Sequence, residues 1–260
     1  MFRCMASETL VPTTAEEAAE LFGDGDGITV LAGGTILMPL ITAGAVSPTR
    51  ALLLHRTGLD AVEGDGDVIR IGAMTTLNAI AAGDESLLAR FAREIADAEV
   101  RSAATLGGNL CAAEGHAVQR GDLAAPLLAL GARVRSTGAG GERTDSLEDF
   151  LAGSREGRLV LSVEYDSGDR RTGAATMRRR HAHSYSIANV AACEREGTLR
   201  IAVSGVVSPA RRCPTVESSR DPQDVLRDVD PVDDAVATAA YRREILPLLV
   251  RRALDELENA

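Results

Sequence analysis

The chain has 260 residues, of which 45% are hydrophobic and 25% charged, and its formal net charge at pH 7 is −10. This composition is typical of a soluble globular protein, and the length allows one domain or two. The negative charge disfavours general binding to nucleic acids. No apolar run approaches the roughly 20 residues of a membrane span, and residues 1–14 lack the apolar core of a signal peptide. We therefore expect a cytoplasmic protein.

The first half of the chain predicts alternating helices and strands. Thr13 or Thr14 can cap a helix that carries Glu16 and Glu17 in its first turn. Short apolar or β-branched runs then predict strands, two of which flank an Asp/Gly turn as a hairpin. The expected elements are a helix over 15–22, strands over 28–31 and 51–54, hairpin strands over 61–63 and 68–71, and helices over 77–82 and 84–98.

The second half begins with a helix over 122–130 that Asp122 can cap. Strands are expected over 132–136 and 159–165, with a helical turn over 146–149 between them. Three strand-like runs follow at 174–180, 187–194 and 199–207, and Glu196-Gly197 is expected to turn the last two into a hairpin. A polar segment over 218–233 should cover the surface before a final helix over 235–259, interrupted or kinked at Pro247. The connector at 166–172 suggests two domains, 1–168 and 169–260.

Two glycine pairs, each beside a threonine, offer a site for a diphosphate. Gly33-Gly34 follows a predicted strand and precedes a helix-compatible segment, while Gly107-Gly108 follows Thr105. Bare backbone N–H groups at such turns suit phosphate oxygens, and glycine permits close approach and a positive φ. Neither pair matches G-x-G-x-x-G or G-x-x-x-x-G-K-[ST]. Alone, a glycine pair is more often just a tight turn.

The cysteines and histidines predict no metal site. No two cysteines have C-x-x-C spacing, which leaves neither a zinc nor an iron–sulfur pattern. Scattered thiols in a cytoplasmic protein are expected to be reduced, and Cys111 is expected to be buried as a small apolar residue. The histidines supply no ligand set, and neither His116 nor His183 belongs to a Ser–His–Asp motif.

Three blocks of the sequence together resemble the FAD-binding medium subunit of molybdenum hydroxylases. That family includes the flavoprotein subunits of carbon monoxide dehydrogenase and xanthine dehydrogenase. The blocks are A-G-G-T-I-L-M-P at 32–39, I-G-A-M-T-T at 71–76 and R-S-A-A-T-L-G-G-N at 101–109. The segment 239–254 also resembles the family's C-terminal helix. The resemblance implies an α+β fold: a two-subdomain FAD-binding (PCMH-type) domain, then a small C-terminal domain of antiparallel strands and helices like that of the carbon monoxide dehydrogenase flavoprotein.

The resemblance also implies where FAD would bind. The first glycine loop should wrap the pyrophosphate, and the second should clasp the diphosphate and ribityl chain. Asp122 matches an acidic position of the family, Leu161 lies on the strand along the adenine, and a basic residue is placed near 178–180. Tyr185 matches an aromatic position that can cover the isoalloxazine. The implied cofactor contacts are Ala32, Gly33, Gly34, Thr35, Ile36, Leu37, Thr105, Gly107, Gly108, Asn109, Asp122, Leu161 and Arg178, with Tyr185 as the catalytic candidate at the flavin face.

Several of these positions keep a second interpretation. Asp122 could be a plain helix cap, Tyr185 a core aromatic residue, and the run 178–180 a solvated or subunit-facing strand. The loop over 113–122 departs from the family pattern N-x-x-x-D-P-x-x-D, because it lacks the proline and has extra residues. This departure falls where the resemblance places the loop near the flavin or adenine.

In the function that the resemblance implies, the flavin carries the redox step and the protein binds and tunes it. Electrons would pass from a molybdopterin large subunit through a [2Fe–2S] small subunit to this FAD, and then to an acceptor such as NAD or a quinone. Two alternatives stay open. The chain could be a free-standing FAD-dependent oxidoreductase of a biosynthetic pathway, or a non-catalytic subunit that keeps the fold but has lost FAD.

Overall fold

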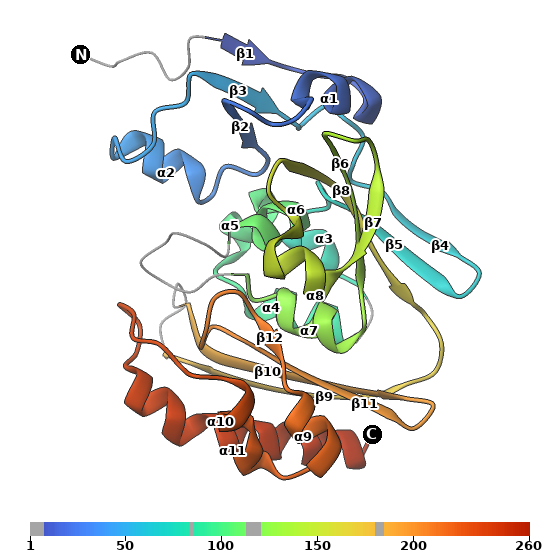
Figure 1. Cartoon of the computed structure of the whole chain (residues 1–260), viewed down its shortest axis with the longest axis vertical. Coiled ribbons are helices and arrows are strands. Elements are labelled where there is room, and N and C mark those ends of the chain that lie inside the picture. The colour runs from blue at the N-terminus through green and yellow to red at the C-terminus, as the bar shows by residue number, and fades with distance from the viewer. Residues whose placement is uncertain (1–7, 84–85, 113–120, 180–184) are drawn as a thin grey trace.

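The computed structural model describes residues 8–83, 86–112, 121–179 and 185–260, which form three stacked layers (Figure 1). A small N-terminal lobe, a middle layer of sheet and helices, and a C-terminal sheet covered by helices follow one another from blue to red. This arrangement matches the predicted α+β fold class. His116, Arg180 and His183, and nearly all of the divergent loop, lie outside the described residues.

The N-terminal lobe is a parallel sheet with the strand order β1-β3-β2, together with two helices. Its elements are β1 (Glu8–Leu10), α1 (Ala15–Phe22), β2 (Ile28–Leu31), α2 (Leu37–Thr42) and β3 (Arg50–Leu53). The Thr14 hydroxyl accepts a hydrogen bond from the Glu17 N–H at 3.1 Å, so the predicted cap of α1 is confirmed. Ala18 and Phe22 of α1 are buried together with Leu52 of β3, which anchors the helix on the sheet.

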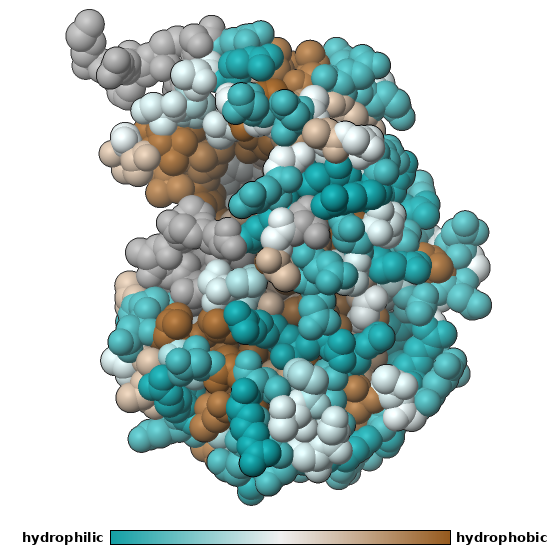
Figure 2. All heavy atoms as spheres, in the orientation of Figure 1, coloured by the Kyte–Doolittle hydropathy of each residue, from teal (hydrophilic) through white to brown (hydrophobic). Residues whose placement is uncertain are grey.

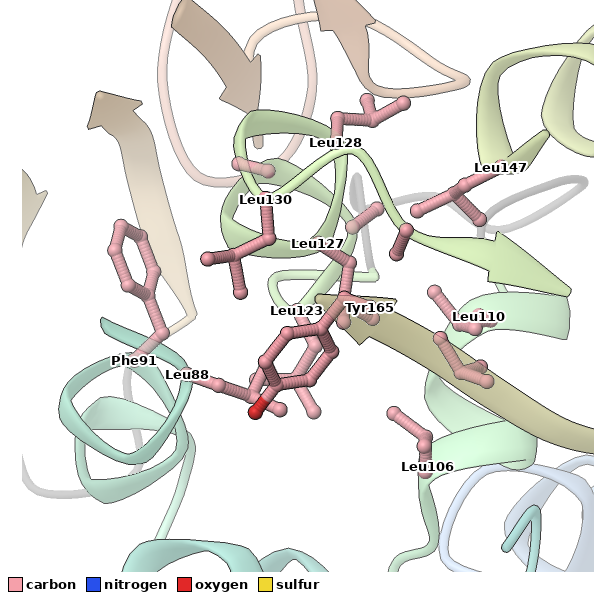
Figure 3. Close-up of a cluster of buried hydrophobic side chains, with 14 of the residues drawn as sticks. Leu88, Phe91, Leu106, Leu110, Leu123, Leu127, Leu128, Leu130, Leu147 and Tyr165 are labelled. Carbon is pink, nitrogen blue, oxygen red and sulfur yellow. The ribbon is translucent and has the colours of Figure 1, made fainter. Parts of the chain in front are cut away.

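The middle layer combines an antiparallel sheet, ordered β4-β5-β8-β6-β7, with a group of short helices. Its strands are β4 (Val62–Asp65), β5 (Val68–Gly72), β6 (Arg133–Gly138), β7 (Arg143–Ser146) and β8 (Arg158–Asp166). Its helices are α3 (Leu77–Ala81), α4 (Leu87–Glu94), α5 (Ala98–Ala103), α6 (Leu106–Cys111), α7 (Ala124–Ala129), α8 (Leu147–Asp149) and η1 (Phe150–Ser154). In Figure 3, leucines of α4, α6 and α7 point toward the ring of Tyr165 from β8. This shared core holds the short helices in place.

The helix predicted over 84–98 forms as α4 but is shorter than expected, and a second helix, α5, begins at Ala98. α4 ends at Glu94, Ala96 has a φ of +48°, and Asp97 caps α5. The Asp97 carboxylate accepts a hydrogen bond from the Val100 N–H at 2.7 Å. This capping bond stabilises a break that the apolar periodicity of the segment does not reveal.

The C-terminal layer is an antiparallel sheet ordered β12-β11-β10-β9, packed between α7 and the last helix. Its elements are β9 (Arg171–Arg178), β10 (Ser186–Arg195), β11 (Thr198–Ser204), β12 (Arg211–Arg212), α9 (Pro214–Ser219), η2 (Pro222–Asp224), α10 (Val225–Asp228) and α11 (Ala239–Glu258). Ala191 and Cys193 face the middle layer, whereas Val190 and Ala192 face α11. Burial of both faces explains why β10 is apolar over most of its length.

Three details of this layer bear on the sequence predictions. Glu196 and Gly197 have φ values of +51° and +76° and form the predicted hairpin turn. α11 continues through Pro247 as one helix. The segment expected at the surface, 218–233, is exposed over most of its length, and Val225 and Val229 anchor it in the core that contains α11. None of the helices in the described ranges is both long and apolar enough to cross a membrane.

Candidate functional site

A cleft of about 430 Å³ opens between the N-terminal lobe and the helices of the middle layer. Figure 2 shows the molecular surface hollowed there, below hydrophobic atoms of the lobe. The first glycine loop and α2 form one wall, and the turn between α4 and α5 together with α6 forms the other. Asp122 and Tyr185 complete the lining from the side of the C-terminal layer. The cleft therefore joins segments that are far apart in the sequence.

Most of the site residues expected from the sequence meet in this cleft. All of the residues predicted in the first glycine loop line the cleft. Three more come from α6 and its capping residue. The last two directly precede α7 and β10. The predicted residues that line the cleft are Ala32, Gly33, Gly34, Thr35, Ile36, Leu37, Thr105, Gly108, Asn109, Asp122 and Tyr185.

Three other expected residues do not line the cleft. The N–H of Gly107 donates to the Ala73 carbonyl at 2.8 Å, and a Cβ on Gly107 would lie 3.0 Å from the Ala73 Cβ. Leu161 is buried in the hydrophobic cluster beneath α1. Arg178 ends β9 and pairs with the Glu94 carboxylate at 2.8 Å. Each of these residues supports a neighbour of the cleft rather than its surface.

The first glycine loop needs its two glycines for different reasons. Gly34 has a φ of +71°, a conformation that favours glycine. Gly33 lies against the end of α5, where a Cβ would stand 1.9 Å from the Ala103 carbonyl oxygen. Ile36, at the start of α2, makes no side-chain capping hydrogen bond. The loop that lines the cleft thus leads into a helix start without a side-chain cap, the kind of backbone that suits an oxyanion ligand.

On the opposite wall the second glycine pair lies inside α6 rather than in a turn. The buried Thr105 hydroxyl accepts a hydrogen bond from the Gly108 N–H at 3.2 Å and caps this helix. The Asn109 side-chain oxygen accepts from the Leu123 N–H at 3.1 Å, which ties α6 to the start of α7. Leu106 and Leu110 anchor the far side of α6 in the core (Figure 3). The wall is therefore tied both to the start of α7 and to the core.

Asp122 is not the cap of the following helix, so that interpretation is wrong. Leu123 precedes α7 and makes no side-chain capping bond. The Asp122 carboxylate, 8% exposed, accepts instead from Ser186 Oγ at 3.1 Å and from Asn189 Nδ2 at 2.9 Å. It thereby connects the cleft to β10 of the C-terminal layer.

Tyr185 is not a core aromatic residue in the structure. Its side chain is 41% exposed and lines the cleft directly before β10 begins at Ser186. It is the aromatic side chain among the described lining residues. A ring at this position can stack on a flat ligand.

Sequence reasoning missed the turn between α4 and α5, which contributes Ile95, Ala96 and Asp97 to the cleft. The Arg101 guanidinium supports this turn, since its Nη1 donates to the carbonyls of Ile95 at 2.9 Å and Ala96 at 2.8 Å. The capping pattern of an aspartate three residues before Val100 is the signal that marks the turn in the sequence.

Cys111 also lines the cleft and is an exposed residue, so the predicted burial of Cys111 is wrong. Although its side chain reaches the cleft surface, desolvation by the surrounding protein raises the pKa of its thiol to about 11. The thiol therefore stays protonated near neutral pH. The charged residues of the described lining are Asp97 and Asp122, and both carboxylates already accept hydrogen bonds. Within the described residues there is no group of three or more His, Cys, Asp or Glu side chains arranged to hold a metal ion.

Comparisons with known proteins agree with this architecture. Residues 5–165 match the family model described as the FAD binding domain in molybdopterin dehydrogenase. The nicotine 6-hydroxylase medium subunit of Paenarthrobacter nicotinovorans is 28% identical, over 94% of this chain and 95% of that protein. The carbon monoxide dehydrogenase medium chain of Hydrogenophaga pseudoflava is 27% identical over 94% of each chain.

A solved structure extends the likeness to the whole fold. Carbon monoxide dehydrogenase from Hydrogenophaga pseudoflava, in a form that lacks the Mo-pyranopterin moiety, superposes with a TM-score of 0.85 at 25% identity. The match covers 100% of this chain and 99% of the other. These findings confirm the predicted family, the α+β fold and FAD as the cofactor. The chain is an FAD-dependent oxidoreductase subunit with an electron-transfer role, and it belongs to the family of FAD-binding domains in molybdopterin dehydrogenases.

Proposed function

We propose that FAD lies in the cleft with its pyrophosphate against the loop over 32–37 and its isoalloxazine toward Tyr185. The observation that carries this proposal is the meeting of the two glycine segments and Tyr185 around one cleft. Since the charged side chains of the described lining are aspartates, backbone N–H dipoles rather than a cation would bind the diphosphate. The uncapped loop before α2 offers such N–H groups.

The remaining contacts follow from this orientation. Thr105, Gly108 and Asn109 would face the middle of the cofactor from α6, and Asp122 would lie beside the end that Tyr185 covers. Gly107, Leu161 and Arg178 would not touch the cofactor and would instead support residues around the cleft. Gly107 lets α6 approach Ala73, Leu161 packs under the lobe, and Arg178 holds Glu94 at the end of α4.

The chemistry divides between cofactor and protein. When bound, FAD supplies a centre that exchanges one or two electrons. The chain's own residues bind it, orient it and shield one ring face from water. The Cys111 thiol has a pKa raised to about 11 by desolvation, so it is a poor nucleophile at neutral pH. The described residues of the cleft thus serve cofactor binding rather than covalent catalysis.

We further propose that the chain works in the cytoplasm with two other subunits, a small [2Fe–2S] protein and a large molybdopterin protein. Several relatives carry the names medium subunit or medium chain, which supports a multi-chain assembly. Electrons would leave the FAD for NAD, a quinone or another external acceptor. We assign residues 1–168 to the FAD-binding PCMH-type domain and 169–260 to the C-terminal domain; the chain passes between their sheets after Asp166.

The test begins with the purified chain and its genomic partners. The chain should carry FAD that acid precipitation releases, and it should prefer FAD to FMN, because FMN lacks the diphosphate. Anaerobic mixing with aldehydes or N-heterocycles should leave the flavin oxidised until the molybdopterin and iron–sulfur subunits are added. Equal affinity for FMN would contradict the diphosphate site. Rapid bleaching of the isolated chain by an organic substrate would instead indicate a free-standing oxidoreductase.

A further inference from the structure

We propose that Asp122 is a positioning residue that holds Tyr185 at the cleft wall and acts on the cofactor through this tyrosine. The inference rests on the proposed site and deepens it. Asp122 precedes α7 in the middle layer, whereas Tyr185 precedes β10 in the C-terminal layer. A connection between the two residues therefore links the middle and C-terminal layers beside the cleft that both residues line.

The connection is a group of buried polar side chains that bond to one another. The Asp122 carboxylate accepts from Ser186 Oγ at 3.1 Å and from Asn189 Nδ2 at 2.9 Å. Asn189 Nδ2 also donates to Ser204 Oγ at 3.2 Å, and Ser204 Oγ donates to the Asp122 carbonyl oxygen at 3.4 Å. Asn189 and Ser204 are each 1% exposed. Because buried polar groups are costly to leave unpaired, this group favours one arrangement of α7, β10 and β11.

The contact reaches Tyr185 through the backbone. Ser186 is the next residue in the chain, so its anchored side chain limits where the Tyr185 Cα can lie. From the opposite side, the fully buried Arg242 of α11 donates through Nε to the Ile187 carbonyl at 3.0 Å. The start of β10 is therefore held from both of its faces. Without the Asp122 contact, the start of β10 keeps only the bond from Arg242, and the backbone at Tyr185 is less constrained.

Two properties of the chain make Tyr185 easy to observe. The sequence has three tyrosines and no tryptophan. Labelling with 3-fluorotyrosine should therefore give three 19F signals, which Tyr→Phe variants assign. The signal of Tyr185 can be followed without any cofactor. With FAD bound, a tyrosine stacked on the isoalloxazine quenches the flavin fluorescence, which reports the same position independently.

The central experiment compares Asp122→Asn with the exchange Asp122→Asn/Asn189→Asp. The single variant keeps an amide oxygen for Asn189 Nδ2 but loses the carboxylate charge and the second acceptor that Ser186 Oγ uses, so it should shift or broaden the Tyr185 19F signal. We expect the population displaced from the cleft wall to rise by about tenfold, the factor for loss of one charge-assisted hydrogen bond. Flavin fluorescence should rise with it. In the exchange, the amide introduced at position 122 donates to the carboxylate introduced at position 189, and both signals should return toward wild type.

The Tyr185→Ala background separates positioning from direct contact. If Asp122 acts through Tyr185, then adding Asp122→Asn to Tyr185→Ala changes neither flavin fluorescence nor FAD affinity further. An equal effect of Asp122→Asn with and without Tyr185 would overturn the proposal, as would an unchanged 19F signal in Asp122→Asn. If the wild-type chain failed to bind FAD, the proposed function would be refuted. The 19F comparison needs no cofactor, so it would still test whether Asp122 positions Tyr185.

Asp228→Asn is the matched control. The Asp228 carboxylate also accepts hydrogen bonds across two elements, from Thr215 Oγ1 at 2.6 Å and the Thr215 N–H at 3.0 Å. It lies in α10, away from the described cleft lining. This variant should lower the thermal stability without moving the Tyr185 signal. A Tyr185 shift as large as that of Asp122→Asn would overturn the specific role of Asp122, because general loosening of the C-terminal layer would then suffice.

Discussion

Gly33 touches the backbone of Ala103 so closely that a Cβ on Gly33 would stand 1.9 Å from the Ala103 carbonyl oxygen. The first glycine loop is therefore packed against the end of α5 as well as open toward the cleft. Close approach at this glycine joins the N-terminal lobe to the middle layer beside the cleft, which Gly33 lines.

Gly33→Ala should therefore lower both stability and FAD binding. Overpacking typically costs about 1–3 kcal/mol, and the obstructing atom here is backbone, which cannot rotate away. Thermal melting and flavin content of the purified variant check this prediction. Gly64→Ala is the control, because a Cβ on Gly64 meets nothing within 4 Å. Wild-type melting of Gly33→Ala would show that the two layers adjust to each other more freely than their contact indicates.

Thr105→Ala should separate a capping role from cofactor binding. Loss of the hydroxyl that accepts from the Gly108 N–H should cost about 1 kcal/mol of folding stability. Because Thr105 also lines the cleft, FAD affinity should fall as well. The Thr14 hydroxyl accepts a hydrogen bond from the Glu17 N–H at 3.1 Å, so Thr14→Ala removes an equivalent cap from α1. It should lower stability by a similar amount and leave FAD affinity unchanged; titration calorimetry distinguishes the two variants.

Tyr185→Ala should change the fluorescence of the bound flavin more than any other tyrosine substitution. The ring is 41% exposed at the cleft wall, so its removal opens one side of the bound isoalloxazine to water. We expect higher flavin fluorescence and an altered rate with electron acceptors. Tyr241→Ala removes a ring that is 40% exposed on α11, outside the described cleft lining. If both variants gave the same spectrum as wild type, Tyr185 would not cover the flavin.

Arg178→Ala should have only a small effect on stability. Its ion pair with Glu94 has side-chain exposures of 38% and 42%, and exposed pairs of this kind contribute about 0–1 kcal/mol. FAD affinity should change by no more than a few-fold, because the guanidinium supports the end of α4 instead of lining the cleft. Complete loss of FAD from a folded Arg178→Ala chain would assign this arginine a direct contact with the cofactor.

Cys111 should react slowly with alkylating agents and contribute a defined pH dependence. Desolvation raises the pKa of its thiol from 9.0 to about 11, so the thiolate fraction below pH 9 is about a hundredfold smaller than for an unperturbed thiol. The folded state then binds more protons than the unfolded state between pH 9 and 11, and stability falls as pH rises through that range. Cys111→Ser should flatten this part of the stability curve. Mass spectrometry of the Cys111 peptide measures alkylation; fast reaction at about pH 8 would contradict the raised pKa.

Local signals in the sequence were sufficient for most elements and for the glycine loop. Thr14 caps α1, Glu196-Gly197 turns β10 into β11, and Gly34 takes a positive φ, each as expected. These features depend on hydrogen bonds and φ angles between near neighbours, so a short stretch of chain is enough to specify them. The three family blocks likewise needed no structure, because their residues and spacing together resemble a single family.

Only the tertiary structure decided the roles of Asp122, Leu161 and Arg178. Asp122 bonds to Ser186 and Asn189, residues more than sixty positions away, so no local pattern distinguishes it from a helix cap. In the sequence, Leu161 is one of several strand leucines and Arg178 is one of three consecutive arginines. The structure buries Leu161 beneath α1 and pairs Arg178 with Glu94. Sequence alone specifies which conformations each segment favours, whereas long-range packing and pairing choose which side chains reach the cleft.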